Sequence, residues 1–545
     1  MSQTTAVLSM LHEPLPLEQG GQIIARDSAG RLFRGQPVLA WTLARLSRAR
    51  KLASAVILCW EDQADAVRPI ARETGAEMLI RSAREPLAPL DSVSAALRWT
   101  DGWRGGLLGA SHFDRGFFAP ACAEAMTLAS ASAAVLIDPS SGLIDPRLID
   151  ELIDHAAAHP DLEYVFSQAA PGLCGLLVRT VLIDRLSKVL THPGRLLNYW
   201  PDTPGRDPIT SDSCLAVAPQ IARTLHRFTL DSARQTRRLS AATESLNGQL
   251  ISTDARGLVA VLDACPSNDP LPRDVTLEIN TRRATRPIYA AGTHLPIARG
   301  DMSVEQIRQI IEQLGETDDL RLTLAGAGDP ALHPEFPAIA RLLAESGIPA
   351  LHIETDLLDL SDEAMAALVN GRFDMVSVHL PAATAPTYER VMGVAKIEQV
   401  VKNLCRLLQL RTGPTPIIVP TFTKCRENLD EMEAWYDSFL KSVGVAVIAG
   451  PSDFAGQIPD HACADMSPPR RRPCQRIRTR MTILSDGSIP ACEQDALAKY
   501  PAANASETTL TNTWRTKLAV LRQDHEAGNL SQRPLCQACR EWHRP

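Results

Sequence analysis

The fold of the second half of the chain is decided by residues 320–355, which have the sequence LRLTLAGAGDPALHPEFPAIARLLAESGIPALHIET. The apolar run Leu320–Ala325 predicts a buried strand, and Ala350–Thr355 predicts another. Between them, apolar residues recur at helical spacing over Pro334–Ser346. A strand, a helix and a second strand in this order predict a parallel βαβ unit.

The same alternation continues on both sides of this unit. Such regular repetition predicts a partial (βα)6 barrel of the TIM-like kind, in which functional side chains lie at the C-terminal ends of the strands. The further strands expected are Val275–Asn280, Met375–Leu380, Pro416–Phe422 and Val443–Ala449, and the further helices are Ser303–Leu314, Ser361–Asn370, Ile397–Leu410 and Leu429–Ser442.

The first half of the chain shows a weaker alternation of the same kind. It predicts a layered α/β domain with a mostly parallel sheet. The strands expected are Ala6–Met10, Ala55–Cys59, Ala133–Ile137 and Tyr164–Ser167, and the helices are Val38–Arg48, Ala64–Thr74 and Arg147–Ala157.

A proline- and asparagine-containing stretch, ACPSNDPLPRD at residues 264–274, predicts a boundary between the two halves. We therefore expect an α/β domain at residues 1–245, a linker at 246–272, the barrel at 273–455 and a small cysteine-bearing domain at 456–545. The last segment contains MTILSDGSIPAC at residues 481–492, where Asp486-Gly487 between two apolar runs predicts a β-hairpin.

The composition is that of an ordinary multidomain protein. Its 545 residues correspond to about two to four domains. With 45% hydrophobic and 22% charged residues, wholesale disorder is excluded. The net charge of −7 gives no electrostatic basis for a nucleic-acid partner. Because the sequence has neither a leader-like start nor a run of about 18 apolar residues, we expect a cytoplasmic protein with no membrane partner.

Four of the twelve cysteines form the clearest chemical pattern. Seventeen residues separate Cys474 from Cys492, and Cys536 and Cys539 form a C-x-x-C pair. Four thiolates suit either a tetrahedral zinc ion or an iron–sulfur cluster, and the spacing alone does not choose between them. The alternative is four unrelated buried cysteines. The polar sequence around Cys536 and Cys539 argues against this interpretation.

The segment from Pro473 to Cys539 resembles the auxiliary-cluster domain, called SPASM or in its shortened form twitch, of radical S-adenosylmethionine (SAM) enzymes. The resemblance implies that the four cysteines ligate an auxiliary [4Fe-4S] cluster. Full SPASM domains carry more cysteines than this segment and hold two clusters. We therefore expect one cluster here.

The barrel resembles the same superfamily. The stretch Leu322–Pro330, followed by Leu332-His333-Pro334, resembles the glycine-rich strand end that meets the amino and carboxylate groups of SAM. Glycine permits close approach of the backbone to a ligand. Segments 352–355, 374–380 and 388–393 resemble later family motifs in the right order. The resemblance implies a cofactor-binding loop at Gly326, Gly328, Asp329 and Pro330.

The first barrel strand departs from the family pattern. Radical SAM enzymes carry C-x-x-x-C-x-x-C after it, and here Arg283, Pro287 and Ala290 occupy the three cysteine positions. None of them supplies a thiolate. We therefore predict that the barrel does not cleave SAM by the usual route; binding of SAM without cleavage stays open.

Arginines take the place of these ligands. Arg282, Arg283 and Arg286 lie on one strand-end loop, a pattern suited to binding a carboxylate or phosphate. The alternative is a solvated basic loop neutralised by Glu278 and other nearby acids.

In the first half, residues 138–150 (DPSSGLIDPRLID) resemble a motif of cytidylyltransferase-like nucleotidyltransferases, which have a GT-A-like fold. Residues 35–39 and 228–232 resemble two further elements of that family. The resemblance implies that Asp138 and Asp231 hold Mg²⁺, which prefers hard oxygen ligands. Because the basic nucleotide loop of the family is reduced here, a degenerate binding or scaffolding domain is the alternative.

Together these patterns predict an iron–sulfur protein of the radical SAM/SPASM lineage that has lost its SAM-cleaving cluster. The remaining cluster would serve electron transfer, binding or structure, and a redox partner and a small-molecule or peptide substrate are expected partners. One rival is a metal-dependent nucleotidyl- or glycosyltransferase acting through Asp138 and Asp231. The other is a zinc-stabilised scaffold without catalysis.

Overall fold

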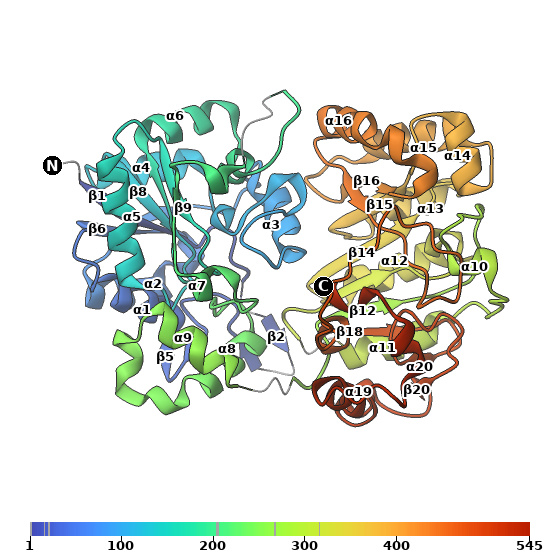
Figure 1. Cartoon of the computed structure of the whole chain (residues 1–545). Helices are drawn as coiled ribbons and strands as arrows, with labels where there is room; N and C mark the ends of the chain where they lie inside the picture. Colours follow the sequence, from blue (N-terminus) through green and yellow to red (C-terminus); the bar gives the residue numbers. More distant parts are fainter. Residues whose placement is uncertain are drawn as a thin grey trace. The chain divides into compact units, whose positions relative to one another are not determined.

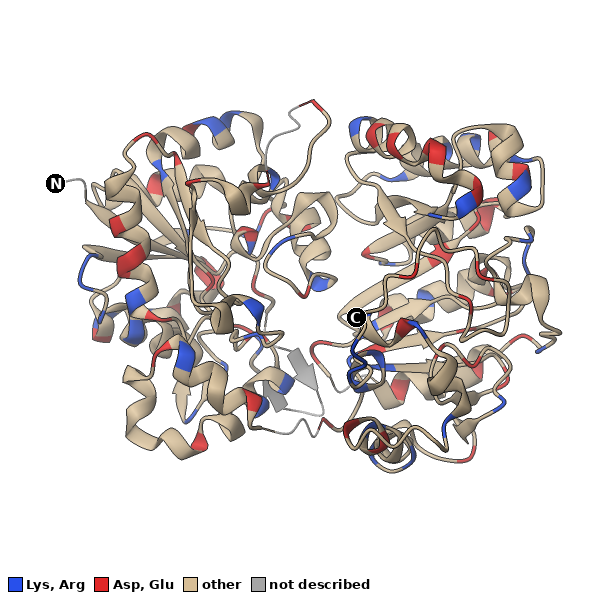
Figure 2. Ribbon diagram, viewed as in Figure 1, with Lys and Arg blue, Asp and Glu red and all other residues tan. Residues whose placement is uncertain are grey.

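In the computed structural model the chain divides between residues 268 and 269 into two units, each with its own sheet (Figure 1). The structure describes residues 3–15, 17–19, 22–202, 207–265, 269–314 and 317–544. Basic and acidic residues are interspersed along the ribbon of each unit (Figure 2). None of the described helices has the length and apolarity needed to cross a bilayer.

The N-terminal unit is built on a seven-stranded sheet in the order β11-β9-β10-β8-β1-β6-β7. Strand β10 is antiparallel to both of its neighbours, and the other adjacent pairs are parallel, which confirms the predicted mostly parallel sheet. The strands are β1 (Thr4–Ser9), β6 (Ser54–Trp60), β7 (Glu77–Arg81), β8 (Ala133–Ile137), β9 (Tyr164–Ser167), β10 (Leu176–Arg179) and β11 (Cys214–Leu215).

Helices cover both faces of this sheet. Successive residues of β1 point to opposite faces, so Ala6 and Leu8 join one apolar cluster and Val7 joins the other. The first face is covered by α1 (Val38–Leu46), α2 (Glu61–Thr74), α5 (Pro146–Ala158), α8 (Ala233–Ala242) and α9 (Ala255–Asp263), and the second by α3 (Leu90–Arg98), α4 (Ala119–Leu128) and α6 (Thr180–Val189).

Much of the segment expected to be a linker belongs to this core. Most of the 3-10 segment η5 (Glu244–Ser252) and all of α9 fall within residues 246–272, and Leu258 and Leu262 of α9 are buried. The buried Arg45 donates hydrogen bonds to the carbonyls of Leu250 (2.6 Å) and Thr253 (2.7 Å). The structure differs from the expected linker because the apolar residues of α9 repeat at helical spacing and pack against the sheet.

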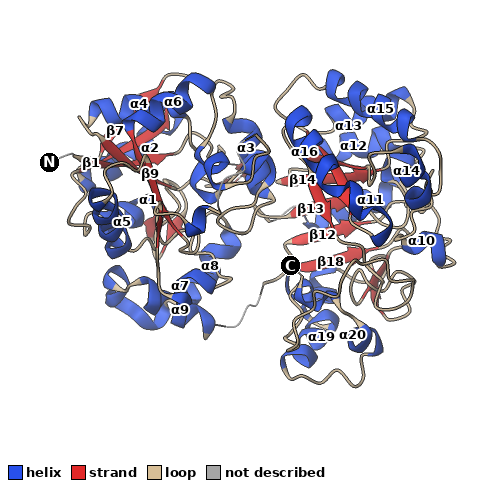
Figure 3. Cartoon of the chain, turned by 45° about the horizontal axis from the view of Figure 1, so that its top comes forward, coloured by secondary structure: helices blue, strands red, loops and turns tan. Residues whose placement is uncertain are grey.

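The C-terminal unit contains a second seven-stranded sheet, in the order β17-β16-β15-β14-β13-β12-β18, with every adjacent pair parallel (Figure 3). Its two edges, β17 and β18, do not pair, so the barrel is open as predicted. The strands are β12 (Asp274–Leu277), β13 (Arg321–Leu324), β14 (Ala350–Thr355), β15 (Met375–His379), β16 (Ile417–Thr423), β17 (Val447–Ala449) and β18 (Arg480–Ile483).

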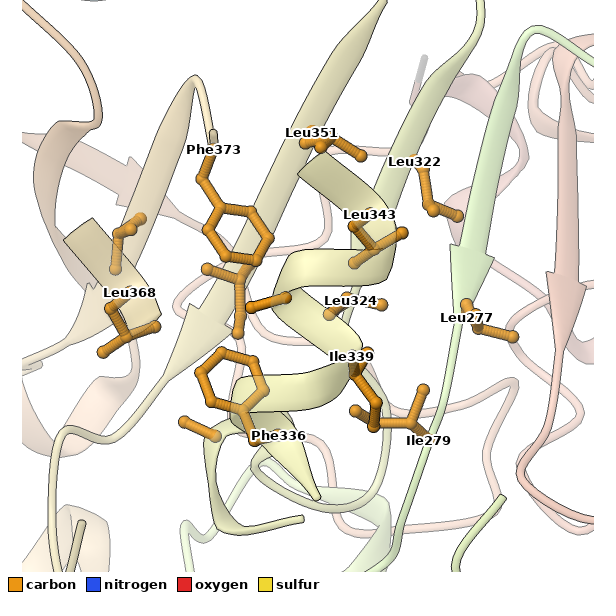
Figure 4. Packing of buried hydrophobic residues seen from close by; sticks show 14 of the residues in the cluster. Leu277, Ile279, Leu322, Leu324, Phe336, Ile339, Leu343, Leu351, Leu368 and Phe373 are labelled. Atoms are coloured by element: carbon orange, nitrogen blue, oxygen red, sulfur yellow. The ribbon is translucent and has the colours of Figure 1, made fainter. Parts of the chain in front are cut away.

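The barrel helices follow the strands in the predicted alternation. Phe336, Ile339 and Leu343 of α12 pack against leucines of the neighbouring strands, which Figure 4 shows from close by. Strands covered in this way are apolar along their length, which explains the continuous runs in the sequence. The helices are α11 (Val304–Leu314), α12 (Phe336–Glu345), α13 (Asp362–Asn370), α14 (Ala385–Met392), α15 (Ile397–Leu410) and α16 (Met432–Val443).

The expected hairpin at residues 481–492 is only partly present. The turn forms, with Gly487 in the left-handed region (φ +80°) and its N–H donating to the Leu484 carbonyl at 2.8 Å. The strands on its two sides pair elsewhere: β18 joins β12, and β19 (Ser488–Pro490) pairs with β20 (Pro501–Asn504). The cysteine-bearing segment therefore contributes a strand to the barrel sheet.

Candidate functional site

The four predicted cysteine ligands come together in one pocket of the C-terminal unit. Cys474 precedes the short helix α17 (Arg476–Thr479), and Cys492 follows β19. Cys536 lies in α20 (Pro534–Ala538), and Cys539 directly follows it. Residues that are distant in the sequence thus present four thiols to one pocket.

Burial raises the pKa of three of these thiols, those of Cys492, Cys536 and Cys539, and keeps them protonated in the absence of a metal. It raises the pKa of Cys536 to about 11, and the neighbouring cysteines add to the rise. The pKa of Cys492 is raised further in the same direction for the same reasons. A bound cation would therefore have to displace protons, which makes ligand binding pH-dependent.

The spacing of the thiols bears on which metal group they fit. A tetrahedral zinc ion with Zn–S bonds of about 2.3 Å holds its sulfur ligands about 3.8 Å apart. Within the described residues, the one group of three potential ligand atoms that all lie within 4.8 Å of one another is elsewhere, at His12, Glu13 and Asp138. The cysteine sulfurs are spread more widely than a single ion requires, and four thiols in one pocket, two of them buried and two half-buried, suit an iron–sulfur cluster.

Two protein groups support the C-x-x-C turn. The N–H of Glu541 donates to Cys539 Sγ at 3.2 Å, and the Arg471 guanidinium donates to the Cys536 carbonyl. On the opposite side, the N–H of Cys474 donates to His525 Nδ1 at 3.3 Å. Of these three supporting residues, His525 and Glu541 are buried, and none of the three was predicted from the cysteine pattern.

The glycine-rich loop of the barrel packs against the residues after β12. A Cβ atom at Gly326 would lie 2.6 Å from Glu278 Cγ, and one at Gly328 would lie 2.5 Å from Asn280 Oδ1. Glu278 is buried and accepts both hydrogen bonds of the Arg299 guanidinium, at 2.8 and 2.9 Å. These contacts within the chain already require glycine at both positions; the predicted contact with SAM remains a prediction.

Asp329 of the same loop is a buried carboxylate with internal partners. It accepts hydrogen bonds from Thr355 Oγ1 and from the N–H of Asp356, both at 2.8 Å. Burial and the Asp356 charge raise the pKa of Asp329 to about 6. Pro330 follows as the first residue of a single 3-10 turn. Asp329 thus ties the loop to the end of β14.

At the position of the first expected cysteine, Arg283 forms a buried ion pair with Asp356. Its Nε and Nη2 atoms donate to the two carboxylate oxygens at 2.8 and 2.6 Å. The side chain of Asp356 is fully buried and that of Arg283 is 13% exposed. Thr285 Oγ1 also donates to Asp356. The family position of a cluster ligand is thus occupied by a satisfied guanidinium.

His379 at the end of β15 completes this network. Its Nδ1 lies 3.0 Å from Asp356 Oδ1, and its Nε2 lies 3.5 Å from Glu354 Oε2. Burial lowers the pKa of His379, but the two carboxylates outweigh it and raise the value to about 9. The ring is therefore protonated at neutral pH. This cluster of Arg283, Asp356, Glu354 and His379 was not predicted from the sequence.

The other two arginines of the loop do not join Arg283. Arg282 pairs with Asp301, and Arg286 is exposed. Glu278, the acid expected to neutralise the loop, is held by Arg299 instead. Because Arg282 and Arg283 are directed at two different acids, the arrangement favours a basic loop neutralised within the chain over three arginines converging on one anion.

The two carboxylates predicted to bind Mg²⁺ in the N-terminal unit lie on either side of an arginine. Arg115 Nε is 3.1 Å from Asp138 Oδ2, and Arg115 Nη1 is 3.0 Å from Asp231 Oδ2. Arg227 also pairs with Asp231. The side chains of Asp138 and Arg115 are 1% and 17% exposed. The sequence correctly placed the two acids together, but a guanidinium of the chain lies where the ion was expected.

Comparisons with known proteins identify two of the segments. Residues 287–437 match the family model of the Radical SAM superfamily, and residues 474–540 match the SPASM iron-sulfur cluster-binding domain. The chain therefore contains a radical SAM domain and a SPASM domain. The second match includes all four cysteines of the pocket.

More distant relatives were also found. A protein of Treponema pallidum (strain Nichols), described as uncharacterized, is 26% identical over 234 residues, which cover 41% of this chain and 64% of that protein. The chain thus spans less than two thirds of the length of that relative. Streptococcus suis SuiB bound to S-adenosylmethionine is 14% identical with a TM-score of 0.39, covering 50% of this chain and 72% of SuiB.

A cytidylyltransferase from Leptospira borgpetersenii serovar Hardjo-bovis (strain JB197) is 14% identical with a TM-score of 0.33, covering 48% of this chain and 93% of that protein. At these identities and scores, the likenesses to solved structures leave the substrate and the reaction of this chain open.

Proposed function

We propose that this chain is an iron–sulfur protein that binds one [4Fe-4S] cluster through Cys474, Cys492, Cys536 and Cys539, and that its radical SAM barrel has lost the cluster that cleaves SAM. The observation that carries the proposal is the buried ion pair between Arg283 and Asp356 at the position of the first expected cysteine. The bound cluster would supply electron transfer or structural support.

The charges at the barrel mouth support the loss of that cluster. An iron–sulfur cluster needs thiolate ligands, and Arg283 provides a permanent positive charge in place of one. The Arg283 guanidinium donates to both oxygens of the Asp356 carboxylate. The protonated His379 ring lies beside one of these two oxygens, Oδ1. Removing this network to admit a cluster would leave Asp356 buried without a partner.

In the cysteine pocket the chain's own residues hold and orient the ligands. Arg471 fixes the carbonyl of Cys536, and the N–H of Glu541 donates to Cys539 Sγ. A hydrogen bond to a ligand sulfur reduces the negative charge that the sulfur carries and raises the reduction potential of a cluster. His525 receives the N–H of Cys474 and so fixes the backbone at the first ligand.

For the N-terminal unit we propose a nucleotidyltransferase-like fold without the magnesium chemistry of that family. Asp138 and Asp231 lie close enough to share Arg115, as the family resemblance implies for the two acids. Arg115 supplies the positive charge that Mg²⁺ would bring. The position of this guanidinium speaks against the rival of a nucleotidyl- or glycosyltransferase that uses Mg²⁺ at these two acids.

Anaerobic purification followed by iron, sulfide and zinc analysis tests the main proposal. We expect about four irons and four sulfides per chain and the electron paramagnetic resonance spectrum of one reduced [4Fe-4S] cluster. About seven or eight irons would show that the barrel holds a second cluster and overturn the claim that it is lost. One zinc per chain and no sulfide would support the scaffold alternative instead.

A further inference from the structure

The edge of the N-terminal sheet where β1 and β8 end carries a second group of metal-ligating side chains. His12 and Glu13 follow β1, and Asp138 directly follows β8. One ring nitrogen of His12 and one carboxylate oxygen each of Glu13 and Asp138 all lie within 4.8 Å of one another. These three residues come from two strands that are far apart in sequence and adjacent in the sheet.

This group lies at a place in the sheet where ligands commonly bind in α/β proteins. From β1 the chain continues through β6 and β7 on one side, and β8 then lies on the other side of β1. The order of strands therefore reverses between β1 and β8. In open α/β sheets, ligands bind outside the carboxyl ends of the strands at such a reversal.

Ser28 fixes the side chain of Glu13. Glu13 is buried and accepts hydrogen bonds to Oε2 from the N–H and the hydroxyl of Ser28, both at 3.0 Å. Ser28 therefore holds the Glu13 carboxyl group within reach of His12 and Asp138.

Unpartnered hydroxyls lie next to Asp138. Ser140 and Ser141 are 3% and 1% exposed, and their Oγ atoms have no hydrogen-bond partner within the described part of the chain. The N–H of Ser140 donates to Asp138 Oδ1 at 2.9 Å, which fixes the carboxylate. Buried hydroxyls without partners are uncommon in folded proteins and call for a further group that they contact.

We propose that the N-terminal unit binds one divalent transition-metal ion of the Mn²⁺ or Zn²⁺ class through His12, Glu13 and Asp138. An imidazole nitrogen with two carboxylates suits these ions, whereas Mg²⁺ prefers oxygen ligands alone. This site shares only Asp138 with the pair expected to hold Mg²⁺. Arg115 pairs with both Asp138 and Asp231, and its charge also acts on His12.

Binding of Mn²⁺ to the full-length, cluster-loaded protein tests the site. Free Mn²⁺ has an electron paramagnetic resonance signal that is lost on binding, and Mn²⁺ prefers oxygen and nitrogen ligands over the thiols of the cysteine pocket. We expect one Mn²⁺ per chain, bound at least tenfold more weakly in His12→Ala and in the isosteric Glu13→Gln. We expect Asp231→Asn to bind within threefold of the unchanged protein, and Zn²⁺ to compete.

Each other outcome overturns the proposal. Absence of stoichiometric binding in the unchanged protein rejects the site directly. Loss of binding in Asp231→Asn with retention in His12→Ala would place the ion between the two aspartates instead. Equal affinity in all variants would mean adsorption at the surface. Circular dichroism of each variant shows whether it is folded, and Cys536→Ser should keep full Mn²⁺ binding, which separates this inference from the proposed cluster.

Discussion

The barrel mouth and the cysteine pocket lie in the same unit and share one sheet, but they treat the expected iron ligands in opposite ways. At the mouth, Arg283 stands in a cysteine position and is neutralised by Asp356. In the pocket, four thiols come together, two of them buried and two half-buried. Under the proposed function, the difference teaches that a lost ligand set is replaced by a satisfied charge network, whereas a retained one stays dependent on a metal.

The largest effect expected from this comparison concerns the pocket. The substitution Cys536→Ser should lower bound iron from about four per chain to below one, because serine is a poor ligand for iron–sulfur clusters. Iron and sulfide analysis of anaerobically purified protein measures it. The matched control is Cys405→Ser, which alters an exposed thiol outside the pocket and should leave the iron content unchanged. Equal iron in both variants would remove Cys536 from the ligand set.

The next effect concerns the network at the barrel mouth. Replacing Asp356 by Asn leaves Arg283 and His379 as buried charges without their shared carboxylate. Loss of one partner of a buried pair costs about 3–5 kcal/mol. The control Asp301→Asn breaks the more exposed pair with Arg282 and should cost less than about 1 kcal/mol.

Urea unfolding of the cluster-loaded protein gives both free energies. If Asp356→Asn and Asp301→Asn lower the free energy of unfolding by the same amount, the ion pairs at the barrel mouth stabilise the protein no more than a surface pair does. The contrast with the cysteine pocket then fails.

The protonated His379 predicts a pH dependence of stability. The pKa of this ring is raised in the folded state to about 9 from 6.5 in the unfolded chain. The stabilisation is therefore complete below about pH 6.5 and is lost as the pH rises through 9. The loss amounts to about 3 kcal/mol if the full shift is realised.

The substitution His379→Gln should remove the decrease in the free energy of unfolding between pH 6.5 and 9. Denaturant titrations across that range would detect this change. An unchanged slope would show that His379 is neutral in the folded protein and that the network holds one positive charge fewer.

The smallest effect concerns the glycine-rich loop. A Cβ at Gly328 would meet the backbone oxygen of Asn280 at 2.6 Å and the nitrogen of Arg282 at 2.8 Å, so Gly328→Ala should destabilise the protein by about 1–3 kcal/mol. The control Gly300→Ala enters open space and should change stability by less than about 0.5 kcal/mol. Thermal unfolding of the two variants side by side provides the test. Tolerance of alanine at Gly328 would mean that the loop is free to move from β12.

Many strands and helices of both units were predictable because they are set by local apolar periodicity. Strands Ala133–Ile137, Tyr164–Ser167 and Ala350–Thr355 were predicted with the bounds that the structure shows. The partner of β18 was not predictable, since an apolar run before Asp486-Gly487 has the same local pattern whether it pairs within a hairpin or with a strand about 200 residues away.

The candidate sites divide in the same way. The cysteine pocket was predicted because C-x-x-C spacing is a local signal. Arg283 was recognisable as a departure from a family motif, but its pairing with Asp356 joins residues 73 positions apart. Arg115 and His12 lie in no motif at all. Only the folding of the N-terminal unit brings these two residues next to Asp138.

Strand β18 has a consequence for how the C-terminal unit is made on the ribosome. Until residue 483 has left the exit tunnel, β12 has no neighbour on one side and exposes a row of backbone N–H and C=O groups. A nascent chain that ends shortly after β17 is therefore open to strand addition by another copy. Expression of the radical SAM segment by itself should yield aggregates, and a soluble fragment would have to extend through β18.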